Sequence, residues 1–271
     1  MHVSLATSAG RTEQPNEDFV GAVPGAVVLL DGAGIPGAEH LCHHGVAWYT
    51  HRLGGALLGH LSRGDGRDLA AILATAIGEI AAEHGDTCDI ADVSSPQATV
   101  AMVRADRGRL DWLLLADSFL VLDQAHVGPR VVTDERERIA RRDCSAPLEG
   151  VARGTPEYDR VRASCATALR ARRNQPGGYW IAKDDPQAAQ EAVTGDRPLA
   201  ELDGVALLSN GASRLVDPYG LTDWPGVLEL LRVGGPAGVL SRVRQAEAQA
   251  GPDVQLPDDA TVAYWPTVNR F

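Results

Sequence analysis

Several features are scarce or missing in this 271-residue sequence, and each absence excludes a class of protein. No apolar run approaches the roughly 18 residues that span a bilayer, and residues 1–18 lack the charged and apolar regions of a signal peptide. The 25 basic residues are outnumbered by 36 acidic ones, giving a net charge of −11. That balance argues against nucleic acid or an anionic membrane as the partner. We therefore expect a cytoplasmic, globular protein.

Cysteine pairs with metal-binding or redox spacing are also missing. The four cysteines lie far apart, without a C-x-x-C motif: Cys42, Cys88, Cys144 and Cys165. This spacing predicts free thiols, and neither a disulfide framework nor a zinc finger. Five of the eight histidines fall between residues 40 and 60. His40 and His44 have helical i,i+4 spacing, but no Glu follows His40, so the H-E-x-x-H zinc motif is absent and surface or capping histidines are expected.

What the sequence does contain is short apolar runs rich in Val and Leu, bounded by Gly, Asp, Asn or Pro, which is typical of β-strands. These runs cover 26–30, 98–103, 110–115, 119–122, 205–208 and 261–265. The second, third and fourth runs are separated by turn-length gaps, which predicts an antiparallel meander. Helical patterns cover two segments within 38–84 and, each opened by a proline, 186–193, 225–231 and 236–250. Because strands and helices segregate along the chain, we expect an α+β fold of antiparallel sheet covered by helices.

Acidic and amide side chains recur where the apolar runs end. Asp31 and Asp117 each follow such a run, Asn210 follows another, and Asp258 precedes the last one, while Asp18 lies near the start of the chain. A single Asp at such a place is a routine turn residue, so turns and helix caps are an alternative explanation. If the strand ends converge, however, the carboxylates repel one another unless cations neutralise them. Hard oxygen ligands of this kind suit Mg²⁺ or Mn²⁺.

The order of these segments resembles the type 2C class of metal-dependent serine/threonine protein phosphatases, the PPM family, in its bacterial form. That family carries Gly-Arg with Asn-Glu-Asp, then Asp-Gly-x-Gly, Gly-Asp-Ser, Ser-Asp-Gly and Asp-Asn-x-Thr. The corresponding segments here are Gly10-Arg11 with Asn16-Glu17-Asp18, Asp31-Gly32-Ala33-Gly34, Ala116-Asp117-Ser118, Ser209-Asn210-Gly211 and Asp258-Asp259-Ala260-Thr261. Each is common alone, but five in the right order across the chain are specific. The resemblance implies a single domain over residues 1–271, built as a four-layer α-β-β-α sandwich of two antiparallel sheets flanked by helices.

The resemblance also implies a site and a reaction. Two Mn²⁺ or Mg²⁺ ions, and a third that binds more weakly, would hydrolyse a phosphomonoester through a water between the first two ions. Asp31 would bridge those two ions, Asp18 and Asp258 would each hold one, and these three are the expected catalytic residues. The carbonyl of Gly32 and the side chain at position 210 would complete the ligands. Asp117 matches the aspartate that helps hold the third ion.

The sequence departs from the family at two positions. Asn210 stands where the family has Asp, which removes one negative charge and predicts weaker metal binding. Either the protein is naturally impaired, or this residue is an inactivating replacement introduced to trap a ligand. Glu13 stands where the family usually has a phosphate-binding Arg. Arg11 is the nearby candidate for contact with substrate phosphate.

The substrate therefore stays open at this stage. Between residues 130 and 173 the chain holds eleven arginines and seven acidic residues, which indicates either a solvated helical face or an electropositive insert, a flap at about 130–180, that attracts an anion. The resemblance favours a phosphorylated protein as substrate, whereas Glu13 and this insert favour a small phosphorylated metabolite. A third possibility is a non-catalytic phosphatase-like module that binds a phosphorylated partner.

Overall fold

The computed structural model describes residues 2–35, 37–38, 40–84, 88–124, 126–250 and 256–267. Its strands form two five-stranded sheets in which all neighbours are antiparallel. The first sheet, in spatial order, contains β1 (Ser4–Ser8), β10 (Ala260–Pro266), β9 (Leu202–Leu208), β6 (Phe119–Gln124) and β7 (Gly128–Val132). The second contains β2 (Phe19–Val23), β3 (Ala26–Ala33), β4 (Gln97–Asp106), β5 (Arg109–Leu115) and β8 (Val193–Pro198).

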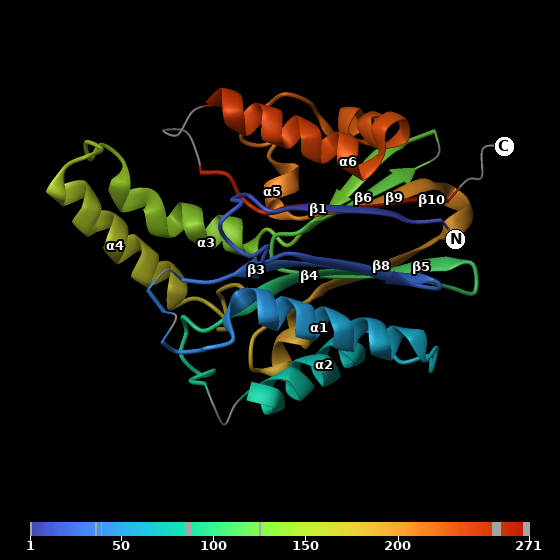
Figure 1. Cartoon of the computed structure of the whole chain (residues 1–271), viewed down its shortest axis with the longest axis horizontal. Coiled ribbons are helices and arrows are strands. Elements are labelled where there is room, and N and C mark those ends of the chain that lie inside the picture. The colour runs from blue at the N-terminus through green and yellow to red at the C-terminus, as the bar shows by residue number, and fades with distance from the viewer. Residues whose placement is uncertain are drawn as a thin grey trace.

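Helices cover the outer faces of both sheets (Figure 1). The second sheet is covered by α1 (Gly45–Ser62) and α2 (Leu69–His84), and the first by α6 (Trp224–Ala250) with the short α5 (Asn210–Ser213). Two further helices, α3 (Arg136–Ser145) and α4 (Pro156–Arg170), pack on each other and project beyond the sheets. Short 3-10 helices are η1 (Ala146–Leu148), η2 (Pro186–Glu191) and η3 (Leu199–Glu201). The expected four-layer α-β-β-α sandwich is confirmed.

Three apolar cores lie between the four layers, because both faces of each sheet are covered. Along β3, Val28 and Leu30 pack toward α1 and α2, whereas Val27 and Leu29 pack toward the opposite sheet. Successive strand residues point to opposite faces, so a strand buried on both sides reads as one continuous apolar run. A third core separates α6 from the first sheet. No helix among the described residues is both long and apolar enough to cross a membrane.

All six predicted strands form, but the predicted meander is wrong at its third strand. β4 and β5 pair as a hairpin, whereas β6 pairs with β9 and β7 in the other sheet. The chain changes sheets at Ala116, whose positive φ of 65° turns the backbone away from β5. The vacant edge of β5 pairs with β8 instead. Local spacing predicts that strands follow one another, but it does not say to which sheet each belongs.

The later helices also differ from the sequence prediction. Residues 186–191 form the 3-10 helix η2, and the chain is already extended in β8 from Val193, because pairing with β5 overrides the local helical pattern. The two segments predicted at 225–231 and 236–250 form α6, with a break at Gly235 (φ 62°, ψ −171°) directly before Pro236. Glycine adopts this backbone conformation without the penalty that other residues incur.

Antiparallel pairing brings the polar strand ends to one end of the sandwich. β3 and β5 both run antiparallel to β4, so both finish at the same edge. In the other sheet, β9 ends beside the start of β10, with Leu208 opposite Val262. Ser8, at the end of β1, lies opposite Ala260. The segments that carry Asp31, Asp117, Asn210 and Asp258 therefore leave the two sheets at one place.

Candidate active site

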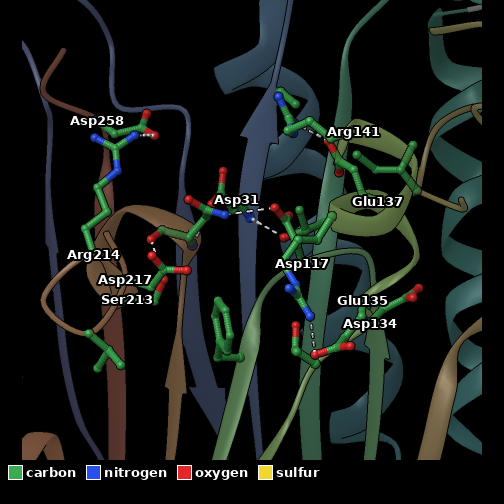
Figure 2. A pocket seen from close by; sticks show the side chains of 18 of the residues that line it. Asp31, Asp117, Asp134, Glu135, Glu137, Arg141, Ser213, Arg214, Asp217 and Asp258 are labelled. Carbon is green, nitrogen blue, oxygen red and sulfur yellow. Dashed lines mark hydrogen bonds and ion pairs between the residues drawn. The ribbon is translucent and has the colours of Figure 1, made fainter. Parts of the chain in front are cut away.

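A cleft of about 730 Å³ opens at this end of the sandwich. Figure 2 shows Asp31 and Asp117 near its centre, with Asp258 on one side and the α3 residues Glu137 and Arg141 on the other. The lining therefore comes from both sheets and from the projecting helix α3. A cavity of this size suits a small ligand or the phosphorylated end of a larger one.

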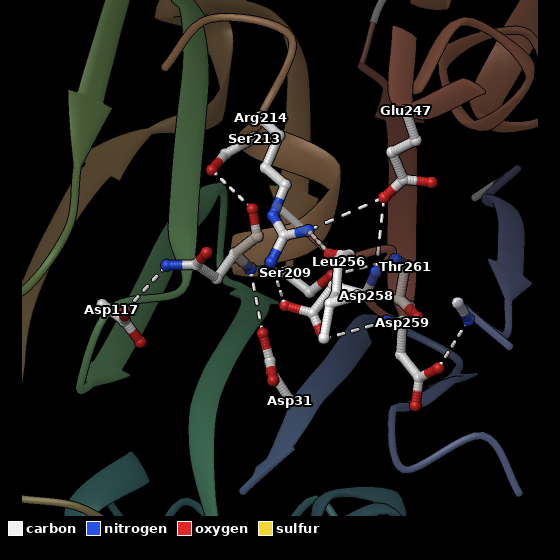
Figure 3. A network of polar contacts seen from close by, with 12 residues as sticks. Asp31, Asp117, Ser209, Ser213, Arg214, Glu247, Leu256, Asp258, Asp259 and Thr261 are labelled. Carbon is white, nitrogen blue, oxygen red and sulfur yellow. Dashed lines mark hydrogen bonds and ion pairs between the residues drawn. The ribbon is translucent and has the colours of Figure 1, made fainter. Parts of the chain in front are cut away.

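Asn210, the first residue of α5, links two carboxylates across the cleft (Figure 3). Its backbone N–H donates to Oδ2 of Asp31 at 3.0 Å, and its side-chain Nδ2 donates to Oδ2 of Asp117 at 2.8 Å. An Asp at position 210 would instead place a third carboxylate against Asp117, and such a contact is repulsive without a cation between them. In this structure the neutral amide satisfies Asp117 directly.

Asp18 is a buried carboxyl group with a side chain that is only 2% exposed. Neither of its oxygens has a hydrogen-bond partner among the described residues. Burial raises its pKa to about 7. The hydroxyl groups of Thr261 and Ser209 act to lower this pKa, and the charges of Asp259 and Asp258 act to raise it. The pKa of Asp31 also lies well above its ordinary value because of burial, followed by the charges of Asp18, Asp117 and Asp258. These carboxyl groups are thus close enough to interact strongly.

The donor set of this cluster fits a hard divalent cation. Buried carboxylates are normally paired with a cation or hydrogen-bonded, because an uncompensated charge in the interior is costly. The Asp18 carboxyl group has no cationic partner and no hydrogen bond of ordinary geometry in the described protein, and only the nearby hydroxyl groups of Thr261 and Ser209 act against the neighbouring carboxyl groups. Oxygen atoms of carboxylates and of a backbone carbonyl are the ligands that Mg²⁺ and Mn²⁺ prefer.

Asp258 is held by an arginine that the sequence analysis missed. Nη2 of Arg214 lies 2.5 Å from Oδ2 of Asp258, and its Nη1 donates to the carbonyl of Leu256 at 2.9 Å (Figure 3). The Arg214 side chain is almost fully buried. Burial raises the pKa of Asp258, and the charge of Arg214 lowers it. This guanidinium group therefore offsets part of the negative charge of the cluster.

The loop before β2 is fastened to the start of β10 by Asp259. Its two oxygens accept hydrogen bonds from the backbone N–H groups of Gly10 at 2.8 Å and Glu17 at 2.6 Å. The segments meet so closely that a Cβ at Gly10 would lie 2.4 Å from the carbonyl carbon of Asp258, and one at Gly32 would lie 2.4 Å from the carbonyl oxygen of Glu17. Only glycine fits at both positions.

Helix α3 supplies the positive charge nearest to Asp117. Burial raises the pKa of Asp117 to about 6, the charge of Glu137 raises it further, and the charge of Arg141 lowers it. Arg141 forms an ion pair with Glu137, and its side chain remains 60% exposed. Arg11, in contrast, is exposed and is not among the described residues that line the cleft.

The structure thus brings most of the predicted site residues together. Those that meet at this end of the sandwich are Asp18, Asp31, Gly32, Asp117, Asn210 and Asp258. Arg11 does not join the cleft lining. The sequence analysis missed Arg214, Asp259 and Arg141. Arg214 follows Asn210 by one helical turn, and this spacing could have predicted that the two side chains lie on the same side of a helix.

Comparisons with solved structures place this fold among bacterial serine/threonine phosphatases. PstP/Ppp of Mycobacterium tuberculosis superposes with a TM-score of 0.58 at 20% identity, covering 97% of both chains. A PstP catalytic domain in complex with two manganese ions matches with a TM-score of 0.58 at 18% identity, over 97% of this chain and 96% of that one. Stp1 of Staphylococcus aureus matches with a TM-score of 0.56 at 15% identity, over 97% and 94%. No protein-family model and no curated protein sequence matches the chain. At these identities the likeness establishes the fold, and the expected type 2C architecture is confirmed at that level.

Proposed function

We propose that this protein is a metal-dependent phosphatase that hydrolyses phosphomonoesters, with phosphoserine and phosphothreonine proteins as its substrates. The observation that carries the proposal is the convergence of Asp18, Asp31, Asp117 and Asp258, with both oxygens of buried Asp18 lacking a hydrogen-bond partner within the described chain. The fold shared with bacterial serine/threonine phosphatases supports it. So does the manganese bound by one of those proteins.

In this proposal the chain's own groups hold and orient two Mn²⁺ or Mg²⁺ ions. Asp31, Asp18 and Asp258 would hold the ions together with the Gly32 carbonyl and the Asn210 side-chain oxygen, with Asp31 serving both ions. Asp117 would serve a third, weaker site. When bound, the ions supply an activated water and positive charge around the phosphoryl group. We expect weak metal binding, because position 210 is neutral and Arg214 already compensates Asp258.

Arg141 is the residue we assign to the substrate phosphate, in place of Arg11. Its guanidinium group lines the cleft, acts on Asp117 and is exposed enough to turn toward a ligand. Planar guanidinium groups bind phosphate oxygens through paired hydrogen bonds. Arg138, also on α3, lines the same cleft and is likewise ion-paired, with Glu135 at 2.8 Å. We prefer Arg141 because its charge acts on Asp117.

Hydrolysis of p-nitrophenyl phosphate with added Mn²⁺ tests the proposal. We expect Mn²⁺-dependent turnover that falls by more than about a hundredfold in Asp31→Ala, since even changes around metal ligands cost about 10- to 100-fold. Asp111→Ala is the matched control, because Asp111 lies on β5 and pairs with Arg104 outside the cleft. A turnover rate that does not depend on Mn²⁺, or that is unchanged in Asp31→Ala, would contradict the proposal.

The substrate class is tested by comparing kcat/KM for phosphoserine peptides with that for sugar and nucleotide phosphates. Higher values for the peptides support the proposal. Higher values for the small molecules favour a metabolite phosphatase. In that case the arginines of the α3–α4 insert would serve as the anion-binding surface.

One pair of contacts favours a second candidate, a non-catalytic module that binds a phosphorylated partner. Asn210 donates a hydrogen bond to Asp117, and Arg214 forms an ion pair with Asp258. Two of the expected ligand residues therefore already have partners within the protein. Calorimetric titration with Mn²⁺ separates the two candidates. Two sites support the enzyme, whereas tight binding of a phosphopeptide without any bound metal supports the module.

A further inference from the structure

A second cluster of metal-binding side chains lies away from the cleft, at the far end of α2. It consists of Cys42 and His44, in the turn before α1, with His84, the last residue of α2, and Cys88 just beyond it. One ligand atom from each of the four residues lies within 4.8 Å of all the others. None of these residues lines the cleft.

Two of the separations within the cluster are close to those around a tetrahedral ion. Sγ of Cys88 lies 3.4 Å from Nδ1 of His44, and Sγ of Cys42 lies 3.9 Å from the same nitrogen. Around zinc, with Zn–S of about 2.3 Å and Zn–N of about 2.0–2.1 Å, neighbouring ligand atoms lie about 3.3–3.8 Å apart. The four ligand atoms all lie within 4.8 Å of one another, about 1 Å beyond the longest of these distances.

Backbone and ring contacts hold the four ligands in place. The Asp89 N–H donates to the Leu41 carbonyl at 2.8 Å, which joins the two segments that carry the cluster, and the Cys88 N–H donates to the His84 carbonyl at 3.1 Å. The His44 ring stacks on Trp48 with their centroids 4.2 Å apart. The site is therefore preorganised by contacts that do not involve a metal.

The chemistry of the cluster differs from that of the carboxylate cleft. Two thiolates and two imidazoles form a Cys₂His₂ set, which is typical of structural zinc and unsuited to Mg²⁺. Cys42 is 4% exposed and His84 is 3% exposed, whereas His44 and Cys88 are half-buried, so the cluster has a buried side and an accessible side. Four protein ligands leave no open coordination position for a substrate, which indicates a structural site.

We propose that Cys42, His44, His84 and Cys88 bind one Zn²⁺ ion that fastens the turn before α1 to the end of α2. Cys42 belongs to the segment that follows β3, and β3 carries Asp31 near its end. The ion thus braces the stretch of chain that leaves the carboxylate site. This inference does not depend on the phosphatase proposal.

The test is the zinc content of the full chain, purified with a reducing agent, loaded with Zn²⁺ and freed of excess ion by gel filtration. We expect one zinc per chain by elemental mass spectrometry. Replacement of zinc with Co²⁺ should give the intense thiolate-to-cobalt absorption and tetrahedral ligand-field bands of a sulfur-containing site. Cobalt in the carboxylate cleft gives neither signal, so the spectrum separates the two sites.

Matched variants assign the ligands. Cys88→Ser and His44→Ala should reduce zinc to background and abolish the thiolate–cobalt band, whereas Cys165→Ser and His51→Ala, which lie outside the cluster, should retain both. Since Cys42→Ser removes a buried group and can fail to fold, the spectrum of the unaltered chain and of Cys88→Ser decides the question. Absence of the band from the unaltered chain, retention of zinc by Cys88→Ser, or a Cys42–Cys88 disulfide in the reduced preparation would overturn the proposal.

Discussion

The carboxylate cleft and the Cys/His cluster lie within one α-β-β-α sandwich and have opposite chemistry. The cleft gathers oxygen atoms from strand ends in both sheets, and its carboxyl groups raise one another's pKa values. The cluster gathers sulfur and nitrogen atoms from one end of a helix pair, where α1 begins and α2 ends. The difference lies in how each is assembled. Pairing within the sheets brings the strand ends of the cleft together, whereas the packing of α1 against α2 brings together the two short segments of the cluster.

The largest expected effect is that each of the two sites can lose its metal without affecting the other. We expect Asp31→Ala to abolish manganese binding and retain zinc, and Cys88→Ser to abolish zinc and retain manganese. Hard cations prefer the oxygen set and zinc prefers the sulfur and nitrogen set. Metal content after loading with both ions measures the outcome. Loss of both metals in either variant would mean that the sites are not independent.

The next largest effect concerns charge within the cleft. Asn210→Asp restores a carboxylate between Asp31 and Asp117, and we expect Mn²⁺ affinity to rise by about 10- to 100-fold, the scale of changes around metal ligands. Phosphatase turnover should rise with it. Isothermal titration with Mn²⁺ measures the change, and Gln245→Glu, an exposed amide-to-carboxylate change on α6, serves as a control outside the cleft lining. An unchanged or lower affinity would mean that Arg214 and Asn210 do not limit metal binding.

A smaller effect is expected for binding of the substrate phosphate. Arg141→Ala should raise KM for p-nitrophenyl phosphate by about tenfold or more, because a hydrogen bond to a charged group contributes about 1.5–3 kcal/mol. Arg142→Ala, one position further along α3 and paired with Asp143, should leave KM unchanged. Equal effects of the two substitutions would exclude a specific role for Arg141. A rise in KM for Arg11→Ala alone would favour the sequence-based assignment.

The smallest predicted effect is a dependence of metal-free stability on pH. Burial first, then neighbouring charges, raise the pKa values of Glu17 and Asp18 to about 7 in the folded chain, from ordinary values of 4.5 and 3.8. Between about pH 4 and pH 7 the folded state therefore holds more protons than the unfolded state, so its stability falls as pH rises through this window.

Thermal unfolding in a chelator measures this effect. The melting temperature should fall between about pH 4 and about pH 7, and the fall should be smaller in Asp18→Asn, because that variant has lost one of the titrating groups. Added Mn²⁺ should reduce the fall by stabilising the ionised carboxylates at the higher pH. A fall of equal size in Asp18→Asn would show that Asp18 is not responsible.

The sequence predicts the buried parts of the fold well and its connections less well. Because β3 is buried on both faces, its sequence is a continuous run of Val and Leu, and this run predicts the strand. β1, β2, β7 and β8 are half-exposed and short, and they lack that signal. The transfer of β6 to the other sheet depends on pairing partners far along the chain, which no local pattern encodes.

The carboxylate positions were predictable because each follows or precedes a core strand in a recognisable motif. The role of Asp259 was not, since it depends on contacts across the site, and Arg214 offered only its spacing of one helical turn from Asn210. The Cys/His cluster was missed for a different reason. Its C-x-H and H-x-x-x-C halves are separated by two helices, and only the packing of α1 against α2 brings Cys42 close to Cys88.

Anomalous X-ray scattering from crystals soaked in Mn²⁺ tests the central claim most directly. The account predicts manganese peaks within bonding distance of the Asp31 carboxylate, with Asp18 and Asp258 as further ligands. Crystals soaked at a saturating concentration that show no manganese beside Asp31 would contradict it.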